Sequence, residues 1–292
     1  MALPSVSAKD MHGIWHVRWL QLVILTVVAV AAASLGAPAG AASASSTSAS
    51  GLPSALKQFA HCPIDNPNVS LCLAASDTGS FVINSTTLTE HAPITLIIGL
   101  IANPDGTYTS VLPDDGSPAM TAPSMAVPGG LLGSGRSGGE LAVRATPQLV
   151  GLPVFSINNL LSGNGPTIVL PTDVLLTNQF LGSDCTIGTA SDPETLNLTD
   201  GTTNPPPPNT PISGTPGTLR AKFHGKMIKL TGSMLVDNSF AVPGASNCGT
   251  GGSFDAAIDA LRGLPSAAGT NTAILGGTSE LAEAKLIRRY VG

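Results

Sequence analysis

The sequence predicts a mainly β fold: a disulfide-bridged β-sandwich or irregular β-barrel with long Gly/Pro-rich loops and one or two short C-terminal helices. Three observations support this prediction. Apolar residues occur in short runs that are separated by Gly, Pro, Asn and Asp. The 292 residues include 33 Gly and 24 Pro, and both residue types disfavour long helices. The four Cys form an even set that can pair.

Each expected strand is a β-branched or aliphatic run of roughly four to six residues with turn residues on both sides. Several such runs without alternating long helices indicate a sandwich or an irregular barrel. The runs are residues 81–84, 94–98, 141–144, 154–157, 167–170, 173–176 and 195–198, with two more strands in residues 222–236 that bend at Gly225 or Gly232.

Two segments near the C-terminus have a helical pattern. Residues 253–263 begin with Ser253 as a candidate cap, continue with an acidic first turn and end at Gly263. Residues 278–290 carry Glu early and Arg late, as a helix prefers. A terminal strand that ends at about Leu281 is the alternative for the first part of this second segment.

The N-terminus has the order of regions that defines a secretory signal peptide. Lys9 and Arg18 supply positive charge, residues 20–33 are almost unbroken apolar sequence, and small residues follow. Cleavage is expected after an A-x-A site at 37–39, which makes residues 1–39 the signal peptide, and residues 42–44 are a second candidate site.

An uncleaved membrane anchor is the alternative for the same segment, formed by residues 20–36 with Trp15 and Trp19 at the interface. Residues 20–33 fall short of the roughly 20 apolar residues that cross a bilayer as a helix. We therefore expect the protein to be secreted or located in the cell envelope.

The remaining chain is expected to form a single domain. Residues 40–55 are a flexible Ala/Ser-rich leader, residues 56–281 form one β-rich extracellular domain, and residues 282–292 are a tail. Tandem Pro in residues 204–211 indicates an extended segment. We interpret it as a surface loop inside the domain, because domain linkers lie where few contacts cross.

All four Cys lie after the signal peptide, at Cys62, Cys72, Cys185 and Cys248. Two disulfides are expected in an exported chain, and three pairings are possible. Pairing Cys62 with Cys72 closes a short loop and leaves Cys185 with Cys248 for a long one. Free buried thiols and a metal site are the alternatives. A metal site is disfavoured because no C-x-x-C spacing occurs and His61 is the only His near a Cys.

Charge is sparse in this chain. Charged residues are 11% of the sequence and the formal net charge is −5. Such a surface gives no electrostatic footprint for nucleic acid or anionic lipid. We expect an extracellular or cell-wall partner of unknown identity, no nucleic acid, and membrane contact only through an uncleaved N-terminal segment.

Two glycine-rich motifs overlap in one stretch. Residues 135–139 match G-x-S-x-G, which would make Ser137 a nucleophile if a buried strand preceded it and a helix followed. Residues 133–138 match G-x-G-x-x-G, which binds dinucleotides only within a βαβ unit. The flanking residues predict neither context. No catalytic, cofactor-binding or metal-binding residue is therefore predicted, and no cofactor.

Two further site types are weakly supported. Carbohydrate sites commonly use exposed aromatic rings, but only two Tyr and no Trp remain after residue 39. Glycosidase chemistry needs two opposed carboxylates. The sequence does not place any two Glu face to face; they are Glu90, Glu140, Glu194, Glu280 and Glu283.

Several segments resemble exported proteins of actinobacteria that have no assigned function. The similarity covers most of residues 57–281 and all four Cys, and it leaves out the leader and the tail after Ala282. The resemblance implies a bacterial secreted or cell-envelope protein and supplies no catalytic residue. The matching segments are residues 59–63 with Cys72, 93–96, 127–131, 180–185, 204–214, 236–245 and 271–275.

These observations favour an exported, non-enzymatic structural or binding protein with an unknown ligand. Loops rich in hydroxyl and amide groups on a disulfide-locked β scaffold suit such a role. One alternative is an extracellular hydrolase that uses Ser137 or an unrecognised carboxylate pair. A carbohydrate-binding module is the other alternative.

Overall fold

The computed structural model describes residues 51–104, 106–133 and 138–291. All of them belong to one compact unit that covers residues 46–292. The predicted signal peptide, most of the leader and Ser137 lie outside the described residues.

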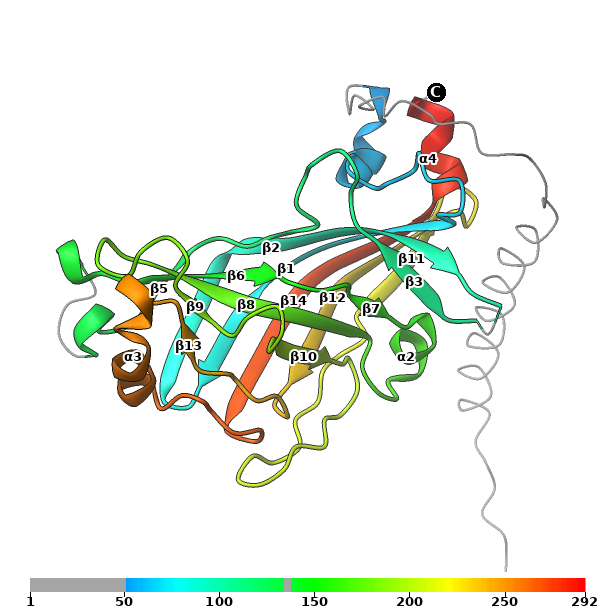
Figure 1. The fold of residues 1–292 in the computed structure, drawn as a ribbon. Coiled ribbons are helices and arrows are strands. Elements are labelled where there is room, and N and C mark those ends of the chain that lie inside the picture. Colours follow the sequence, from blue (N-terminus) through cyan, green and yellow to red (C-terminus); the bar gives the residue numbers. More distant parts are fainter. Residues whose placement is uncertain (1–50, 105, 134–137, 292) are drawn as a thin grey trace, which may run out of the picture. The chain divides into compact units, whose positions relative to one another are not determined.

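Two antiparallel sheets stack face to face in this unit (Figure 1). The predicted mainly β fold is confirmed, and of its two forms the structure has the sandwich, because the sheets do not join into a closed barrel. Aliphatic side chains from both inner faces form the main core between the sheets. This stacking is what a sheet with one apolar face needs in order to bury that face.

The first sheet, sheet A, contains the longest strands. It runs in the order β11-β12-β14-β1-β2-β3, and β4 pairs with β2 beside β3. Its strands are β1 (Leu71–Ile83), β2 (Thr86–Ala102), β3 (Tyr108–Val111), β4 (Met120–Thr121), β11 (Thr218–Lys222), β12 (Met227–Asp237) and β14 (Asn271–Glu283).

The second sheet, sheet B, is built around β8. It runs in the order β13-β9-β8-β6-β5, and β7 and β10 also pair with β8. Its strands are β5 (Met125–Ala126), β6 (Arg144–Leu149), β7 (Val154–Phe155), β8 (Ile168–Thr177), β9 (Thr186–Ile187), β10 (Glu194–Leu198) and β13 (Ala245–Ser246).

Most predicted strands lie inside longer ones. The runs 167–170 and 173–176 are halves of β8, which continues through Pro171 while the Pro171 carbonyl accepts from the Val150 amide. Of the two strands expected in residues 222–236, only β12 lies there; β11 precedes the range and ends at Lys222. The turn between β11 and β12 contains Gly225, and Gly232 lies at a register shift. The strand expected at 141–144 is wrong: residues 139–141 form a short 3₁₀ helix, and β6 begins at Arg144.

The helices are short. They are the 3₁₀ turns η3 (Ser54–Phe59), η4 (Gly130–Leu132), η5 (Gly139–Leu141) and η6 (Thr250–Gly252), and the α-helices α2 (Ile157–Ser162), α3 (Asp255–Arg262) and α4 (Ala284–Val291). Helix α3 confirms the first helical prediction and ends at a left-handed Gly263, but no Ser253 side chain caps it. The segment 278–290 divides, with strand to Glu283 and helix from Ala284. No helix among the described residues is long and apolar enough to cross a bilayer.

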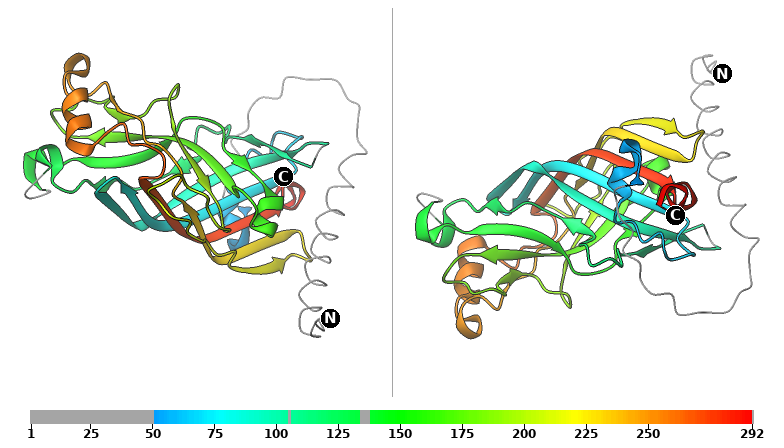
Figure 2. Two further views of the ribbon diagram at one scale, coloured as in Figure 1. Left: turned by 90° about the horizontal axis from the view of Figure 1, so that it is seen from below. Right: turned by 90° about the horizontal axis from the view of Figure 1, so that it is seen from above.

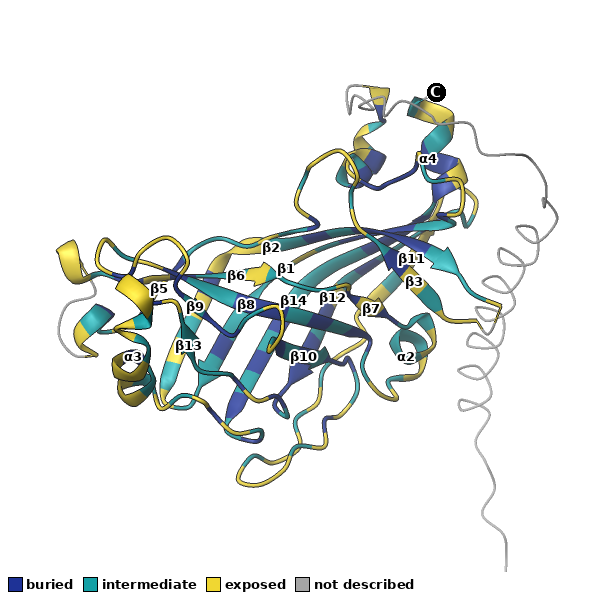
Figure 3. Ribbon diagram, in the orientation of Figure 1, coloured by how far each residue is buried: buried dark blue, intermediate teal, exposed yellow. Residues whose placement is uncertain are grey.

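Sheet A separates two cores. Figure 3 shows buried residues along the strands of sheet A and also in η3 and α4. Leu73 of β1 joins the main core, while its neighbours Cys72 and Ala74 join a second cluster on the outer face. That second cluster lies under η3 and α4, which Figure 2 shows together at one end of the sheet. The predicted tail is therefore packed structure: Leu286 and Ile287 of α4 are buried there because α4 is amphipathic.

Each core contains one disulfide. Cys62–Cys72 lies in the second cluster, and Cys185–Cys248 lies in the main core. The two bridges close the short loop and the long loop of the pairing described in the sequence analysis. Two disulfides indicate an oxidising environment. Residues 204–211 fall within the long loop and are held to the domain, because the Asn209 amide donates to the Asn238 and Asn271 carbonyls.

Candidate functional site

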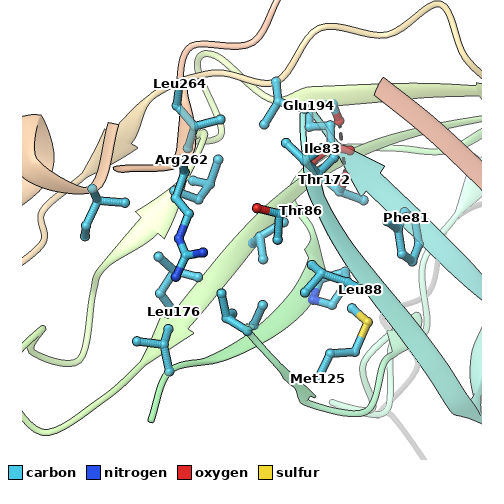
Figure 4. Close-up of a pocket in the computed structure, with 18 of the residues that line it drawn as sticks. Phe81, Ile83, Thr86, Leu88, Met125, Thr172, Leu176, Glu194, Arg262 and Leu264 are labelled. Carbon is cyan, nitrogen blue, oxygen red and sulfur yellow. Dashed lines mark hydrogen bonds between the residues drawn. The ribbon is translucent and has the colours of Figure 1, made fainter. Parts of the chain in front are cut away.

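A cavity of about 120 Å³ lies between the two sheets at the end of the sandwich covered by α3. Figure 4 shows that side chains from both sheets and from α3 surround it. Nearly all of them are aliphatic, aromatic or thioether groups. Labelled examples are Phe81, Ile83, Leu88, Met125, Leu176 and Leu264.

The period of two along the strands explains this lining. On β8, Leu170, Thr172, Val174 and Leu176 alternate in sequence, and all four line the cavity. On β1, Phe81 and Ile83 do the same from the opposite sheet. Residues of α3 and η4 complete the lining at this end of the sandwich.

The β1–β2 hairpin is fastened to α3 beside the cavity. Its turn residue Asn84 has φ 51°, in the left-handed region that Asn tolerates better than most residues. The Asn84 amide donates to the Gly263 carbonyl at 2.5 Å. Leu261 of α3 lines the cavity and is 42% exposed, so the apolar lining continues to the surface at this point.

Arg262 also lines the cavity, at the end of α3. Its guanidinium donates to the Pro128 carbonyl at 3.0 Å and to the Gly130 carbonyl, which fastens the η4 segment to α3. Among the described residues no carboxylate lies within ion-pair distance of it. Burial lowers the pKa of Arg262 from its usual value.

Glu194 is the one acidic side chain of the described residues that lines the cavity. It is 4% exposed and occupies β10 two residues before the buried Leu196, on the inner face of sheet B. No described group forms a hydrogen bond with its carboxyl oxygens. Burial, helped by the negative charge of Asp237, raises the pKa of Glu194 to about 8. At neutral pH this side chain is therefore mostly a neutral carboxylic acid, which has an O–H to donate.

The groups around Glu194 have partners of their own. The Thr172 hydroxyl donates to the backbone carbonyl of Glu194 at 3.2 Å. The buried Asp237 carboxylate accepts from the Asn197 amide at 2.6 Å and from the amide and hydroxyl of Ser239 at 2.8 and 2.7 Å. Asp237 thus has hydrogen-bond donors on its carboxylate and lies outside the cavity lining, whereas Glu194 lines the cavity and its carboxyl has no hydrogen-bond partner among the described residues.

The other glutamates considered from the sequence lie elsewhere. Glu280 forms an ion pair with Lys229 at 2.7 Å, and a Glu90 carboxylate oxygen accepts from the Ala92 amide. Glu140 lies in η5 and Glu283 ends β14. None of these four lines the cavity, so no opposed carboxylate pair forms there. Ser137 lies outside the described residues.

A Ser, a His and an Asp do meet on the surface, at a place that the sequence analysis did not identify. The Asp115 carboxylate and the Ser117 hydroxyl lie 2.8 and 2.9 Å from His61. Both bonds end on the same ring nitrogen, Nδ1, whereas a catalytic triad uses one ring nitrogen for each partner. The hydrogen bond from His61 lowers the pKa of Asp115. This cluster is an exposed turn contact.

A smaller cavity of about 50 Å³ lies further along the sandwich. Asp77 of β1 lines it beside Leu73 and Phe155, and burial raises the pKa of Asp77 to about 6. No set of three or more His, Cys, Asp or Glu in the described part of the chain is arranged to hold a metal ion.

The sequence contains a signal for Glu194 in the alternation of β10. The expected strand began at residue 195, but Glu194 continues the alternation of Leu196 and Leu198 toward the core. An acidic residue in register with inward leucines is a candidate functional group by itself.

Comparisons of the chain with models of known protein families, with curated proteins and with solved structures give no match, so the geometry of this cavity is the observation from which function has to be inferred.

Proposed function

We propose that the chain is an exported, non-enzymatic binding protein that takes an apolar small molecule, or the apolar end of a larger one, into the cavity between its sheets. The composition of the cavity is the main observation in support: an aliphatic lining interrupted by Thr86, Thr172, Glu194 and Arg262. Ligand pockets have this character, with a few polar groups that set orientation.

The size of the cavity fits this ligand class. An engineered apolar cavity of roughly 150 Å³ stays dry and binds benzene. A cavity of about 120 Å³ accepts a group of similar or slightly smaller bulk. A sugar would leave most of its hydroxyl groups unpaired against such a lining, so carbohydrate binding is disfavoured at this site.

Export is part of the proposal. It rests on the order of charged, apolar and small residues in residues 1–39 and on the two disulfides. Mass spectrometry of a culture supernatant tests this step: we expect an N-terminus between residues 40 and 45, and an intact N-terminus in the membrane fraction would contradict it.

Ligand binding is tested by filling the cavity. Val174 lines it from β8, and Val174→Phe should occupy the volume that a ligand needs. Calorimetric titration with benzene should show binding to the oxidised protein and at least a tenfold loss in the variant. Val154→Phe is the matched control, because Val154 is 57% exposed on β7 and lines neither cavity.

Two results would refute the proposal. One is a wild-type protein that binds neither benzene nor n-octane. The other is a Val174→Phe variant that binds benzene as tightly as the Val154→Phe control does.

A further inference from the structure

We propose that the cavity selects an uncharged ligand with an oxygen acceptor, such as a ketone, ester or ether, and that the Glu194 carboxyl donates a hydrogen bond to this oxygen. The inference rests on the proposed function and specifies its ligand class. It starts from one side chain: a carboxyl that is 4% exposed, lines an aliphatic cavity and has no protein partner among the described residues.

A buried polar group without a partner is costly, and proteins satisfy most of them. The polar groups nearest to Glu194 make their hydrogen bonds elsewhere: the Thr172 hydroxyl donates to the backbone carbonyl of Glu194, and the Asp237 carboxylate accepts from Asn197 and Ser239. Glu194 lines the cavity, so a bound ligand can reach it there. An acceptor oxygen on a bound ligand would complete the hydrogen bonding of the carboxyl without adding charge.

An anionic ligand fits this site poorly. Its carboxylate would approach Glu194 next to the buried negative charge of Asp237, and like charges at close range disfavour each other. Arg262 is the cation of the lining, but its guanidinium already donates to the Pro128 and Gly130 carbonyls and holds η4 in place.

A cationic ligand is disfavoured for a different reason. An ammonium group has three N–H donors, and the Glu194 end of the cavity provides one carboxyl for them. The remaining donors would face aliphatic side chains. The desolvation penalty of a buried ion pair with unsatisfied donors exceeds its electrostatic attraction. A neutral acceptor needs one donor only, which is what Glu194 offers.

Four probes with the same chain length distinguish these ligand classes: n-octane, 2-octanone, octanoate and octylamine. Their binding to the oxidised protein is measured by calorimetry at pH 6. Glu194→Leu removes the donor and should weaken 2-octanone about tenfold while octane affinity is kept. Glu194→Gln retains N–H donors and should keep the ketone affinity close to wild type. Glu140→Leu, on the exposed η5, is the matched control and should change neither.

The pH dependence provides an independent readout. The carboxyl loses its proton above a pKa of about 8, so at pH 9.5 wild-type protein should bind 2-octanone at least tenfold more weakly than at pH 6. Glu194→Gln should show no such loss, since its amide does not titrate. Octane affinity should change less than ketone affinity in the wild-type protein.

The outcomes separate the two proposals. If no probe binds, the proposed function fails. If octane binds but Glu194→Leu leaves the affinity for 2-octanone unchanged, the proposed function stands and the assignment of Glu194 is wrong. Tightest binding of octanoate, lost in Arg262→Gln, would instead identify an anion site at Arg262, and tightest binding of octylamine would identify a cation site. Either result overturns the inference.

Discussion

At the scale of single residues, Glu194 departs most clearly from what folding alone would select. A leucine at this position would continue the pattern of Leu196 and Leu198 and would bury apolar area. The glutamic acid instead introduces a buried carboxyl without a partner. Such departures from local consistency are expected at functional sites, where stability is given up for another property.

The stability of the protein should record the protonation of Glu194. Its pKa in the folded protein is about 8, above the usual 4.5, so the folded state holds this proton more tightly than the unfolded state. The stabilisation of the folded state by this proton is complete below pH 4.5 and is lost as pH rises through 8. Chemical denaturation should show that Glu194→Gln gains about 2 kcal/mol over wild type between pH 6.5 and 8.5.

The choice of this pH window separates Glu194 from Asp77, whose pKa is raised to about 6 and which is largely ionised by pH 6.5. Glu140→Gln is the same change at an exposed position, and its free energy of unfolding should follow the pH dependence of the wild-type protein. Stability curves of Glu194→Gln and wild type that also stay parallel from pH 6.5 to 8.5 would contradict a buried, protonated Glu194.

At the scale of elements, the sequence predicted those whose pattern is local. β10 and the C-terminal end of α3 were found because alternation, or a terminal Gly, lies within a few residues. The full lengths of β1 and β2 were missed because their register is set by pairing with each other and with β14. The short turn η5 and the start of β6 at Arg144 stand where a strand was expected at 141–144, a short run whose β-propensity alone does not decide its structure.

Helix α4 is a second element whose role depends on distant contacts. The Arg288 guanidinium donates to the carbonyls of Ile64, Asn66 and Val69 at 2.7, 2.8 and 3.1 Å, more than 200 residues away in the chain. No pattern within the helix reveals these partners. They fasten α4 to the loop that ends in β1, next to the Cys62–Cys72 disulfide.

Removing this guanidinium should loosen the docking of α4. Arg288→Leu leaves three carbonyls without their donor, and we expect it to lower the free energy of unfolding by about 2 kcal/mol. Arg289→Leu is the matched control, since Arg289 is exposed and should tolerate the change within about 0.5 kcal/mol. Urea unfolding measures both, and equal effects would contradict a docking role for Arg288.

At the scale of the whole molecule, the sandwich class could be predicted from strand-sized runs, but the cavity could not. Its lining combines residues from Phe81 to Leu275, and these meet only after the two sheets stack. The number of disulfides could be predicted from the sequence, but the position of the long disulfide near the cavity could not. Cys185–Cys248 ties the start of β9 to the segment before α3. The backbone carbonyl of Cys248 accepts from the Phe254 amide, and the backbone amide of Cys248 donates to the Asp255 carboxylate.

The two disulfides should therefore differ in their effects. Replacing Cys185 and Cys248 by Ser opens the longer loop, with a sequence separation of 63 against 10, and should cost about 4 kcal/mol against about 3 for Cys62 and Cys72. The first double variant should also weaken binding of benzene, because α3 covers the cavity. Denaturation and calorimetry measure the two effects. Equal loss of benzene affinity in both variants would show that the long bridge does not support the cavity.

The separation of the two cores by sheet A has a practical consequence for handling the protein. The cavity opens beside α3, whereas α4 packs on the opposite face of that sheet. A biosensor chip or affinity resin coupled through a tag after α4 would hold the protein by its far side. Capture of volatile or lipid-like compounds from a complex extract could then proceed without the support obstructing entry.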